Sequence, residues 1–266
     1  MADATIFQDK VKQLKEGINV ENVLSLAIKT PGIKINRIDY LTKELRLYYP
    51  QETVELALEH NPAYTGIPRS AVDAIAKRAI DYETSKVTAI SFAAGMPGGM
   101  AMAATIPADL AQYFAFILRI MQKLAYLYGF GEFDLNDESI DDDTMCNIMV
   151  FLGVMFGVQE ANAAIKVLAT AVSQNIAKKL SQKALMKTAY YPIVKKIAAA
   201  LGVRMTKDIF AKSVSKIVPV IGGVTTGALT FATFKPNAIK LKKKLSELPI
   251  SDPEFYRDKK VIIEEA

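Results

Sequence analysis

The stretch from Ser91 to Phe116, SFAAGMPGGMAMAATIPADLAQYFAF, decides how this chain folds, because it is apolar and yet interrupted near its middle. It overlaps a run of twenty-two residues, Val87 to Ala108, that carries no charge. A run of that length is enough to cross a bilayer as one helix. The Gly-Met-Pro-Gly-Gly at 95–99 does not suit a straight helix, because proline lacks the amide donor and glycine favours turns. We therefore expect two apolar helical arms joined by a turn.

Helical periodicity dominates the rest of the chain, and no segment alternates convincingly as a strand would. Helical runs are predicted at 6–16, 19–29, 36–49, 52–60, 69–90, 107–129, 144–158, 161–203, 217–234 and 237–248. The fold class expected is all-α, a multi-helix globular bundle with three Gly-rich apolar helical segments or hairpins in its core. We divide the chain into an N-terminal helical segment (1–62), a main helical domain (63–246) and a polar tail (247–266).

The helix predicted at 69–90 shows the usual signals of a helix with one face in water. Ser70 is a candidate N-cap because Asp73 follows three positions later, which resembles a capping box. Asp73, Lys77 and Asp81 recur every four residues, so we place them on the solvated face.

Each of the three charge-poor segments contains two glycines spaced by three residues: Gly95 and Gly99, Gly153 and Gly157, Gly223 and Gly227. In a helix this spacing lets a neighbouring backbone approach closely, either between membrane helices or in a tightly packed soluble core. Two segments are only marginally long enough to span a membrane and the third is broken. A soluble bundle with buried apolar hairpins that can open onto a bilayer is the interpretation we favour.

The content of cysteine and histidine excludes several kinds of chemistry. Cys146 and His60 are the only residues of their types, so an internal disulfide framework and the common zinc sites are excluded. A Ser-His-Asp triad would have to use His60, which lies at a predicted helix end. The first residues lack the pattern of a signal peptide. We expect a cytoplasmic protein without a cofactor.

Charge is distributed unevenly along the chain. Between Ala161 and Ser246 there are sixteen Lys or Arg and one acid, Asp208, whereas the remaining residues carry seventeen basic and twenty-seven acidic side chains. This asymmetry predicts an anionic partner. Lysine dominates and arginine is almost absent, which favours anionic membrane lipid and makes nucleic acid unlikely as a partner. The residues expected to dock on the anionic surface are Lys178, Lys179, Lys183, Lys187, Lys195 and Lys196. In the alternative, this is an ordinary basic face, or one that the acidic N-terminal half of the chain neutralises.

Three motifs together resemble the EcsC family of bacterial proteins: SFAAGMPGGMAMAATIPADLAQYF, QKLAYLYG and VPVIGGVTTGALTFATF. The resemblance covers roughly residues 63–245. It implies a helical, non-secreted bacterial protein with a connection to a membrane or an ABC transporter. It supplies no catalytic residues.

The helix predicted from Pro107 carries the one constellation that could bind a ligand. Asp109, Gln112, Arg119 and Lys123 fall on one side of it, with Tyr113 one turn above Asp109. The neighbouring turn can offer backbone N–H groups to an anion. The candidate lipid- or ligand-binding residues are Gly95, Pro97, Gly98, Gly99, Asp109, Gln112, Tyr113, Arg119 and Lys123. In the alternative, Asp109 is an ordinary first-turn acid, and Arg119 and Lys123 are solvated.

The function predicted first is that of a non-enzymatic protein that docks on anionic lipid through its Lys-rich helices, at the inner face of the cell membrane. Its Gly-rich hairpins would pack, insert or bind acyl chains. One alternative is an enzyme or small-ligand binder that acts on a lipid or phosphate-bearing substrate, with Asp109 near Gly98 and Gly99. Another is a regulatory subunit of an ABC transporter or another membrane protein.

Overall fold

A computed structural model describes residues 20–95, 106–135, 142–178, 193, 195–201 and 222–257. Every regular element in these ranges is helical, which confirms the predicted all-α bundle. The labelled elements are α2 (Val20–Ile28), α3 (Arg37–Leu45), α4 (Gln51–Glu59), α5 (Arg69–Gly95), α6 (Ile106–Leu127), α7 (Asp142–Met155), α8 (Gln159–Lys178), α10 (Gly222–Ser246) and the short 3-10 turn η3 (Pro249–Ser251). A further helical stretch covers residues 195–201.

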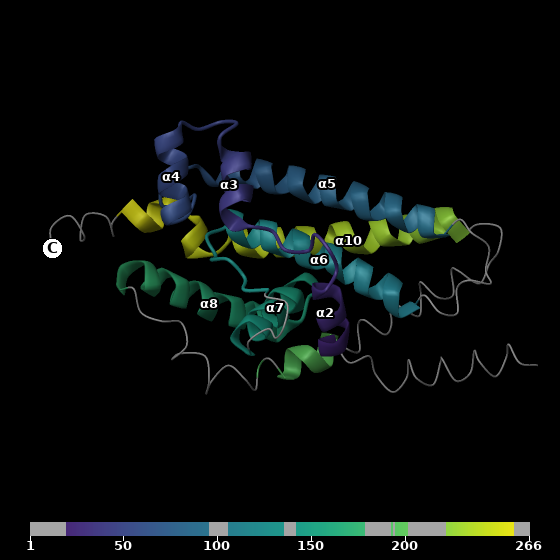
Figure 1. Cartoon of the computed structure of the whole chain (residues 1–266). Helices are drawn as coiled ribbons and strands as arrows, with labels where there is room; N and C mark the ends of the chain where they lie inside the picture. Colours follow the sequence, from purple (N-terminus) through teal and green to yellow (C-terminus); the bar gives the residue numbers. More distant parts are fainter. Residues whose placement is uncertain are drawn as a thin grey trace, which may run out of the picture.

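α6 is the central helix of the described bundle. It packs against α2, α3, α5, α7 and α10, and Figure 1 shows it between the α5–α10 pair and the layer of α2, α7 and α8. Its residues are buried on nearly every side, including Ile117, Ile120 and Leu124, which have no exposed surface. A helix surrounded in this way needs apolar residues around its whole circumference. The composition of α6 satisfies that requirement except at polar residues such as Arg119, Gln122 and Lys123.

α5 and α10 lie side by side and run in opposite directions (Figure 1). Two ion pairs fix their register: Asp81 lies 2.7 Å from Lys235, and Asp73 lies 3.0 Å from Lys242. Asp73 and Asp81 remain partly exposed, with 32% and 45% of their side-chain surface accessible, so the face predicted to be solvated also pairs with lysines of α10. Ser70 is not the N-cap, because α5 already begins at Arg69.

α10 joins two elements that the sequence separates. The apolar segment 217–234 and the basic helix 237–248 were predicted as distinct, whereas α10 runs without interruption through Pro236. Proline inside a helix removes one backbone hydrogen bond. On either side of it, Phe234, Ala238 and Leu241 are completely buried. Their packing in the common core maintains the helix across the proline.

Glycine ends two of the central helices. Gly129 follows α6 with φ +97° and Gly157 follows α7 with φ +71°. After α7, Val158 donates to the carbonyl of Gly153 (2.7 Å) and Gly157 to that of Val154 (3.0 Å). These two bonds define a Schellman cap. Gly153 and Gly157 therefore do not share a helix face, contrary to the helical interpretation of their spacing.

Gly153 nevertheless marks a close approach of helices. A Cβ at this position would lie 2.6 Å from the Cβ of Ala161 on α8 and 2.8 Å from Ile197 Cγ2. Both distances are shorter than carbon atoms tolerate, so only glycine fits here without a shift. In this segment, the prediction of tight packing in the core is confirmed.

The described parts of all three predicted regions contribute to one hydrophobic core. Leu24 and Leu41 lie in it beside residues of α6, and so do Leu248 and Ile250 beyond the end of α10. The chain after residue 247 is thus not simply a polar tail. Among the described helices, none is both long and apolar enough to cross a bilayer.

Candidate functional site

A buried carboxylate occupies the middle of α5. The buried positions Ile75, Ala76, Ala79, Ile80 and Val87 form the inner face of the helix, and Glu83 falls on the same face with no exposed surface. An ionised carboxylate in the interior is strongly destabilising unless charged or hydrogen-bonding groups compensate it. The surroundings of Glu83 are therefore the first place to look for a functional arrangement.

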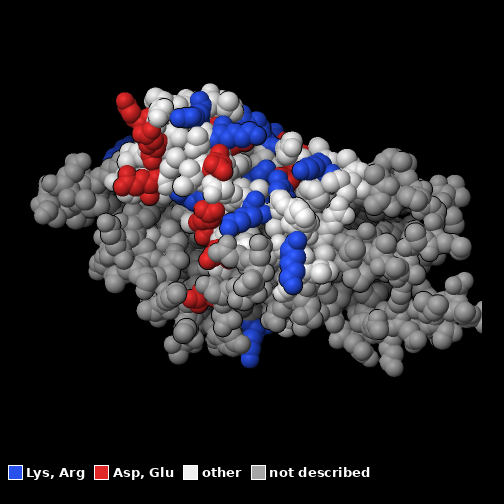
Figure 2. All heavy atoms as spheres, in the orientation of Figure 1, with Lys and Arg blue, Asp and Glu red and all other residues white. Residues whose placement is uncertain are grey.

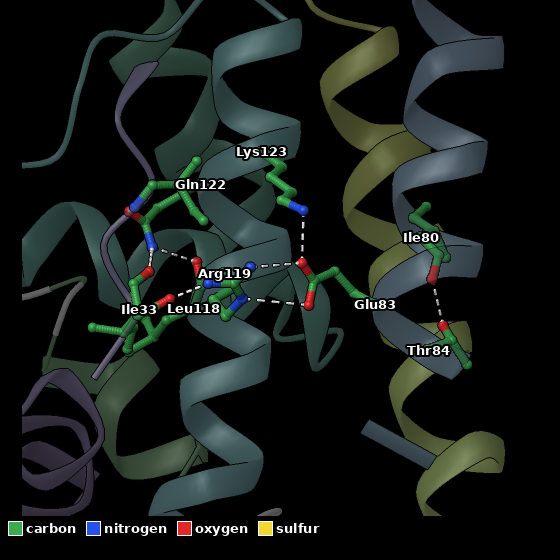
Figure 3. A network of polar contacts seen from close by, with 10 residues as sticks. Ile33, Ile80, Glu83, Thr84, Leu118, Arg119, Gln122 and Lys123 are labelled. Atoms are coloured by element: carbon green, nitrogen blue, oxygen red, sulfur yellow. Dashed lines mark hydrogen bonds and ion pairs between the residues drawn. The ribbon is translucent and has the colours of Figure 1, made fainter. Parts of the chain in front are cut away.

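Two cations from α6 meet Glu83, as Figure 3 shows. Arg119 and Lys123 are one helical turn apart. Lys123 Nζ lies 2.6 Å from Glu83 Oε1, and Arg119 reaches both carboxylate oxygens, at 3.2 Å through Nη2 and 3.4 Å through Nε. The three side chains form a charge cluster with one negative and two positive charges, which we call the Glu83 cluster.

The electrostatics of the Glu83 cluster favour the ionised acid. Burial alone would raise the pKa of Glu83, but hydrogen bonds from Lys123 and Arg119 and their positive charges outweigh it and lower the pKa. The surplus positive charge lies against aromatic rings, because Lys123 Nζ is 5.5 Å from the ring centre of Tyr40 and 5.4 Å from that of Tyr82. Such cation–π contacts stabilise a cation that carboxylates do not fully compensate.

The same stretch of α6 also holds the segment between α2 and α3. Arg119 donates to the carbonyl of Gly32. The amide of Gln122 donates to the carbonyl of Ile33 at 3.0 Å and accepts from the backbone N–H of Ile35 at 3.0 Å. Gln122 is completely buried and thus satisfies backbone groups that would otherwise lie unpaired in the interior.

The structure brings together only part of the ligand-binding set predicted from the sequence. Arg119 and Lys123 are neighbours, but their partner is Glu83. Lys123 is only 9% exposed, so the alternative that these cations are simply solvated is wrong. Tyr113 is buried and its hydroxyl donates to Thr233 Oγ1 at 3.3 Å. Gln112 is half-buried.

The structure describes only some of the remaining predicted site residues. Asp109 lies in the first turn of α6 and Gly95 is the last residue of α5, whereas Pro97, Gly98 and Gly99 lie outside the described residues. In the docking set, Lys178 ends α8, and Lys195 and Lys196 are exposed. Lys179, Lys183 and Lys187 also lie outside the described residues.

Glu83 and Gln122 were not singled out from the sequence, although a signal for Glu83 was present. The apolar residues Ile75, Ala76, Ala79, Ile80 and Val87 recur at spacings of three and four, and Glu83 continues that series. An acid on the apolar face of a helix predicts a buried cation on a neighbouring helix. Gln122 gives no such signal, because its partners are backbone groups of a distant segment.

Several of the other titratable groups among the described residues are buried. Burial raises the pKa of Tyr40, Tyr126 and Tyr128 well above the ordinary value, so these phenols stay neutral. His60 ends α4 and stacks on Tyr64, with ring centres 3.9 Å apart. Within the described ranges, no cluster of His, Cys, Asp and Glu could hold a metal ion.

Comparisons with protein families, with curated proteins and with solved structures found no match to this chain. The resemblance to the EcsC family rests on its three sequence motifs and stays a prediction.

Proposed function

We propose that this protein associates with anionic lipid at the inner face of a bacterial cell membrane, without catalysing a reaction, through the lysines between residues 178 and 196. One observation carries the proposal. From Ala161 to Lys207 the chain has nine Lys or Arg and no acid, and Lys166, Lys195 and Lys196 are exposed in its described part. Lysine near an anionic bilayer contributes about 1 kcal/mol per residue to binding.

Three lysines of α10 are paired with acids, so we leave them out of the proposed docking surface. Lys235 and Lys242 pair with acids of α5, and Lys244 lies 3.5 Å from Glu247. Figure 2 shows that on the face it displays basic and acidic side chains are interspersed over the described helices. Neighbouring acids therefore account for these lysines of α10, and we assign lipid binding to the acid-free run.

The alternative of an enzyme or ligand site near Asp109 is less favoured. Its two cations, Arg119 and Lys123, are held by Glu83, so a phosphate would have to compete with a buried carboxylate 2.6 Å from Lys123. Breaking that contact would leave Glu83 buried without compensation, which is strongly unfavourable.

The test of the proposal is replacement of Lys178, Lys179, Lys183 and Lys187 by Gln. We expect affinity for vesicles of equal parts phosphatidylglycerol and phosphatidylcholine to fall by about two to three orders of magnitude, because four contributions of about 1 kcal/mol are removed. Flotation with vesicles at low and high salt measures this change. Circular dichroism verifies that the helices are retained.

A matched control removes the same charge from the acidic part of the chain. Lys29, Lys34, Lys43 and Lys77 are all exposed, and their replacement by Gln should leave vesicle binding nearly unchanged. Equal loss in both variants would point to net charge alone, and unchanged binding in the first variant would contradict the proposal.

A further inference from the structure

Three helix ends meet at one end of the molecule. α5 and α10 are antiparallel with Asp81 opposite Lys235, so the same register brings Gly95, the last residue of α5, near Gly222, the first residue of α10. α6 begins at Ile106 at this end as well. In Figure 1 these are the only described helices that extend to the right-hand end of the molecule.

The residues at this end are almost free of charge. We call it the apolar end and define it by the helical residues Val87–Gly95, Ile106–Leu118 and Gly222–Phe234. Asp109 is the only charged residue among them. Elsewhere in the same three helices, acids and bases are frequent, and they form the ion pairs described above.

Lysines mark the base of the apolar end. Lys86 and Lys235 are the first charged residues met on α5 and α10 when one moves away from it. Each lies over an aromatic ring: Lys86 Nζ is 5.9 Å from the ring centre of Phe116, and Lys235 Nζ is 5.6 Å from that of Phe231. Phe231 is 49% exposed. Phe116 is buried, so only Lys235 lies beside an exposed ring, an arrangement typical of side chains at the boundary between hydrocarbon and lipid headgroups.

The length of the apolar end fits half a bilayer. At about 1.5 Å per residue, α5 extends roughly 14 Å beyond Lys86, and α10 extends roughly 20 Å beyond Lys235. The hydrocarbon of one leaflet is about 15 Å thick. No described helix can cross both leaflets, so these lengths match a wedge that enters one of them.

We infer that the apolar end inserts into the hydrocarbon of a single leaflet of an anionic bilayer, with Lys86 and the ion pair of Lys235 and Asp81 at the level of the lipid headgroups. This inference rests on the proposed membrane association, which brings the protein to the surface. Insertion then adds apolar contact that salt does not screen. Asp109 opposes insertion, because a carboxylate in hydrocarbon is unfavourable.

Tryptophan reporters test the inference directly, because the chain contains no tryptophan. Phe92→Trp places a reporter close to the end of α5, and Phe231→Trp places one near the base. Leu47→Trp is the matched control, since Leu47 is 67% exposed and follows α3, a helix that Figure 1 shows away from the apolar end. The probes are vesicles of equal parts phosphatidylglycerol and phosphatidylcholine whose acyl chains carry bromine either near the glycerol or near the chain end.

The expected result is a blue shift and quenching for the first two variants and neither for Leu47→Trp. Phe92→Trp should be quenched most by bromine near the chain end, and Phe231→Trp by bromine near the glycerol. Flotation without quenching at either site overturns the inference and leaves surface docking intact. No flotation with any vesicle overturns the proposed function and this inference together.

A second variant tests insertion through its energetics. Asp109→Asn removes the only charge of the apolar end, so the fraction bound at high salt should increase several-fold, with Asp39→Asn, an exposed acid on α3, as the control. An unchanged or smaller fraction for Asp109→Asn overturns the inference, since an inserted acid must oppose binding.

Discussion

At the scale of single residues, Glu83 determines how the centre of the bundle is held together. Its carboxylate, which has no exposed surface, binds two cations of α6, and one of these also binds the carbonyl of Gly32. The side chain of Arg119 thus connects α6 both to α5 and to the segment before α3. Removal of an acid from such a cluster leaves buried positive charge without compensation.

We expect Glu83→Gln to lower the free energy of unfolding by about 3–5 kcal/mol, the usual effect of breaking a buried ion pair on one side. Urea denaturation followed by circular dichroism measures the change. Glu44→Gln is the control, because Glu44 pairs with Arg78 at 3.7 Å and Arg78 is half exposed. Its loss should stay below about 1 kcal/mol. Similar small losses in both variants would contradict a structural role for the Glu83 cluster.

Glu83→Gln should also change how the stability of the protein depends on acidic pH. Burial would raise the pKa of Glu83, but Lys123 and Arg119 lower it, and in the folded protein it lies below the ordinary value of 4.5. Its contribution to stability is therefore complete above about pH 4.5 and is lost as the pH falls through the lowered folded pKa. In Glu83→Gln the unfolding free energy should decline less steeply with falling pH over this range. An unaltered slope would show that other acids control the acid transition.

At the scale of helices, close packing decides where elements end and how near they approach. α7 ends in a glycine cap, and α8 follows so closely that Gly153 has no room for a side chain. The helical stretch 195–201 reaches the same spot through Ile197, which is completely buried. Three helical segments therefore meet at one glycine.

Gly153→Ala should lower the free energy of unfolding by about 1–3 kcal/mol, because the new methyl group overpacks against Ala161 and Ile197. The gain in helix propensity, about 1 kcal/mol, offsets only part of this loss. Gly131→Ala is a suitable control, since no atom lies within 4 Å of the position its Cβ would take. Thermal unfolding compares the two, and a variant of Gly153 as stable as the native chain would refute the close approach.

The elements that were predictable are those whose signals are local. Asn36 accepts a hydrogen bond from Asp39 N and begins α3, at the start of the helical run predicted from residue 36. The continuity of α10 was not predictable, because only packing in the core maintains the helix at Pro236. The pairing of Asp73 and Asp81 with lysines of α10 was not predictable for the same reason: those lysines lie more than 150 positions later in the sequence. The Glu83 cluster likewise depends on a pairing of α5 with α6 that periodicity does not specify.

At the scale of the whole molecule, buried tyrosines join distant parts of the chain. Tyr256, near the end of the described chain, accepts from Asn61 Nδ2 at 2.9 Å and donates to the carbonyl of Ile250 at 3.1 Å. Tyr128, just after α6, donates to Asp73 on α5, which also binds Lys242 on α10. Each hydroxyl must keep its proton for these contacts to persist.

Alkaline pH should therefore unfold the protein cooperatively. Burial raises the pKa of Tyr256 from 10 to about 12, and it raises those of Tyr40, Tyr126 and Tyr128 as well. The stabilisation from a raised pKa is complete below about pH 10 and is lost as the pH rises through the folded value. Tyrosinate absorbance and circular dichroism, recorded together, should change in one step. Gradual ionisation with unchanged helicity up to pH 12 would contradict this expectation. In Tyr256→Phe, the free energy of unfolding should fall less between pH 10 and 12 than it does in the native protein.

The long separation between α5 and α10 has a consequence for synthesis of the chain. About 130 residues lie between the end of α5 and the start of α10, and translation at about 5–20 residues per second takes roughly 6 to 25 s to supply them. During that interval α5 and α6 have left the ribosome without the helix that covers them. A chaperone or a membrane surface near the ribosome therefore meets these helices before their own partner exists.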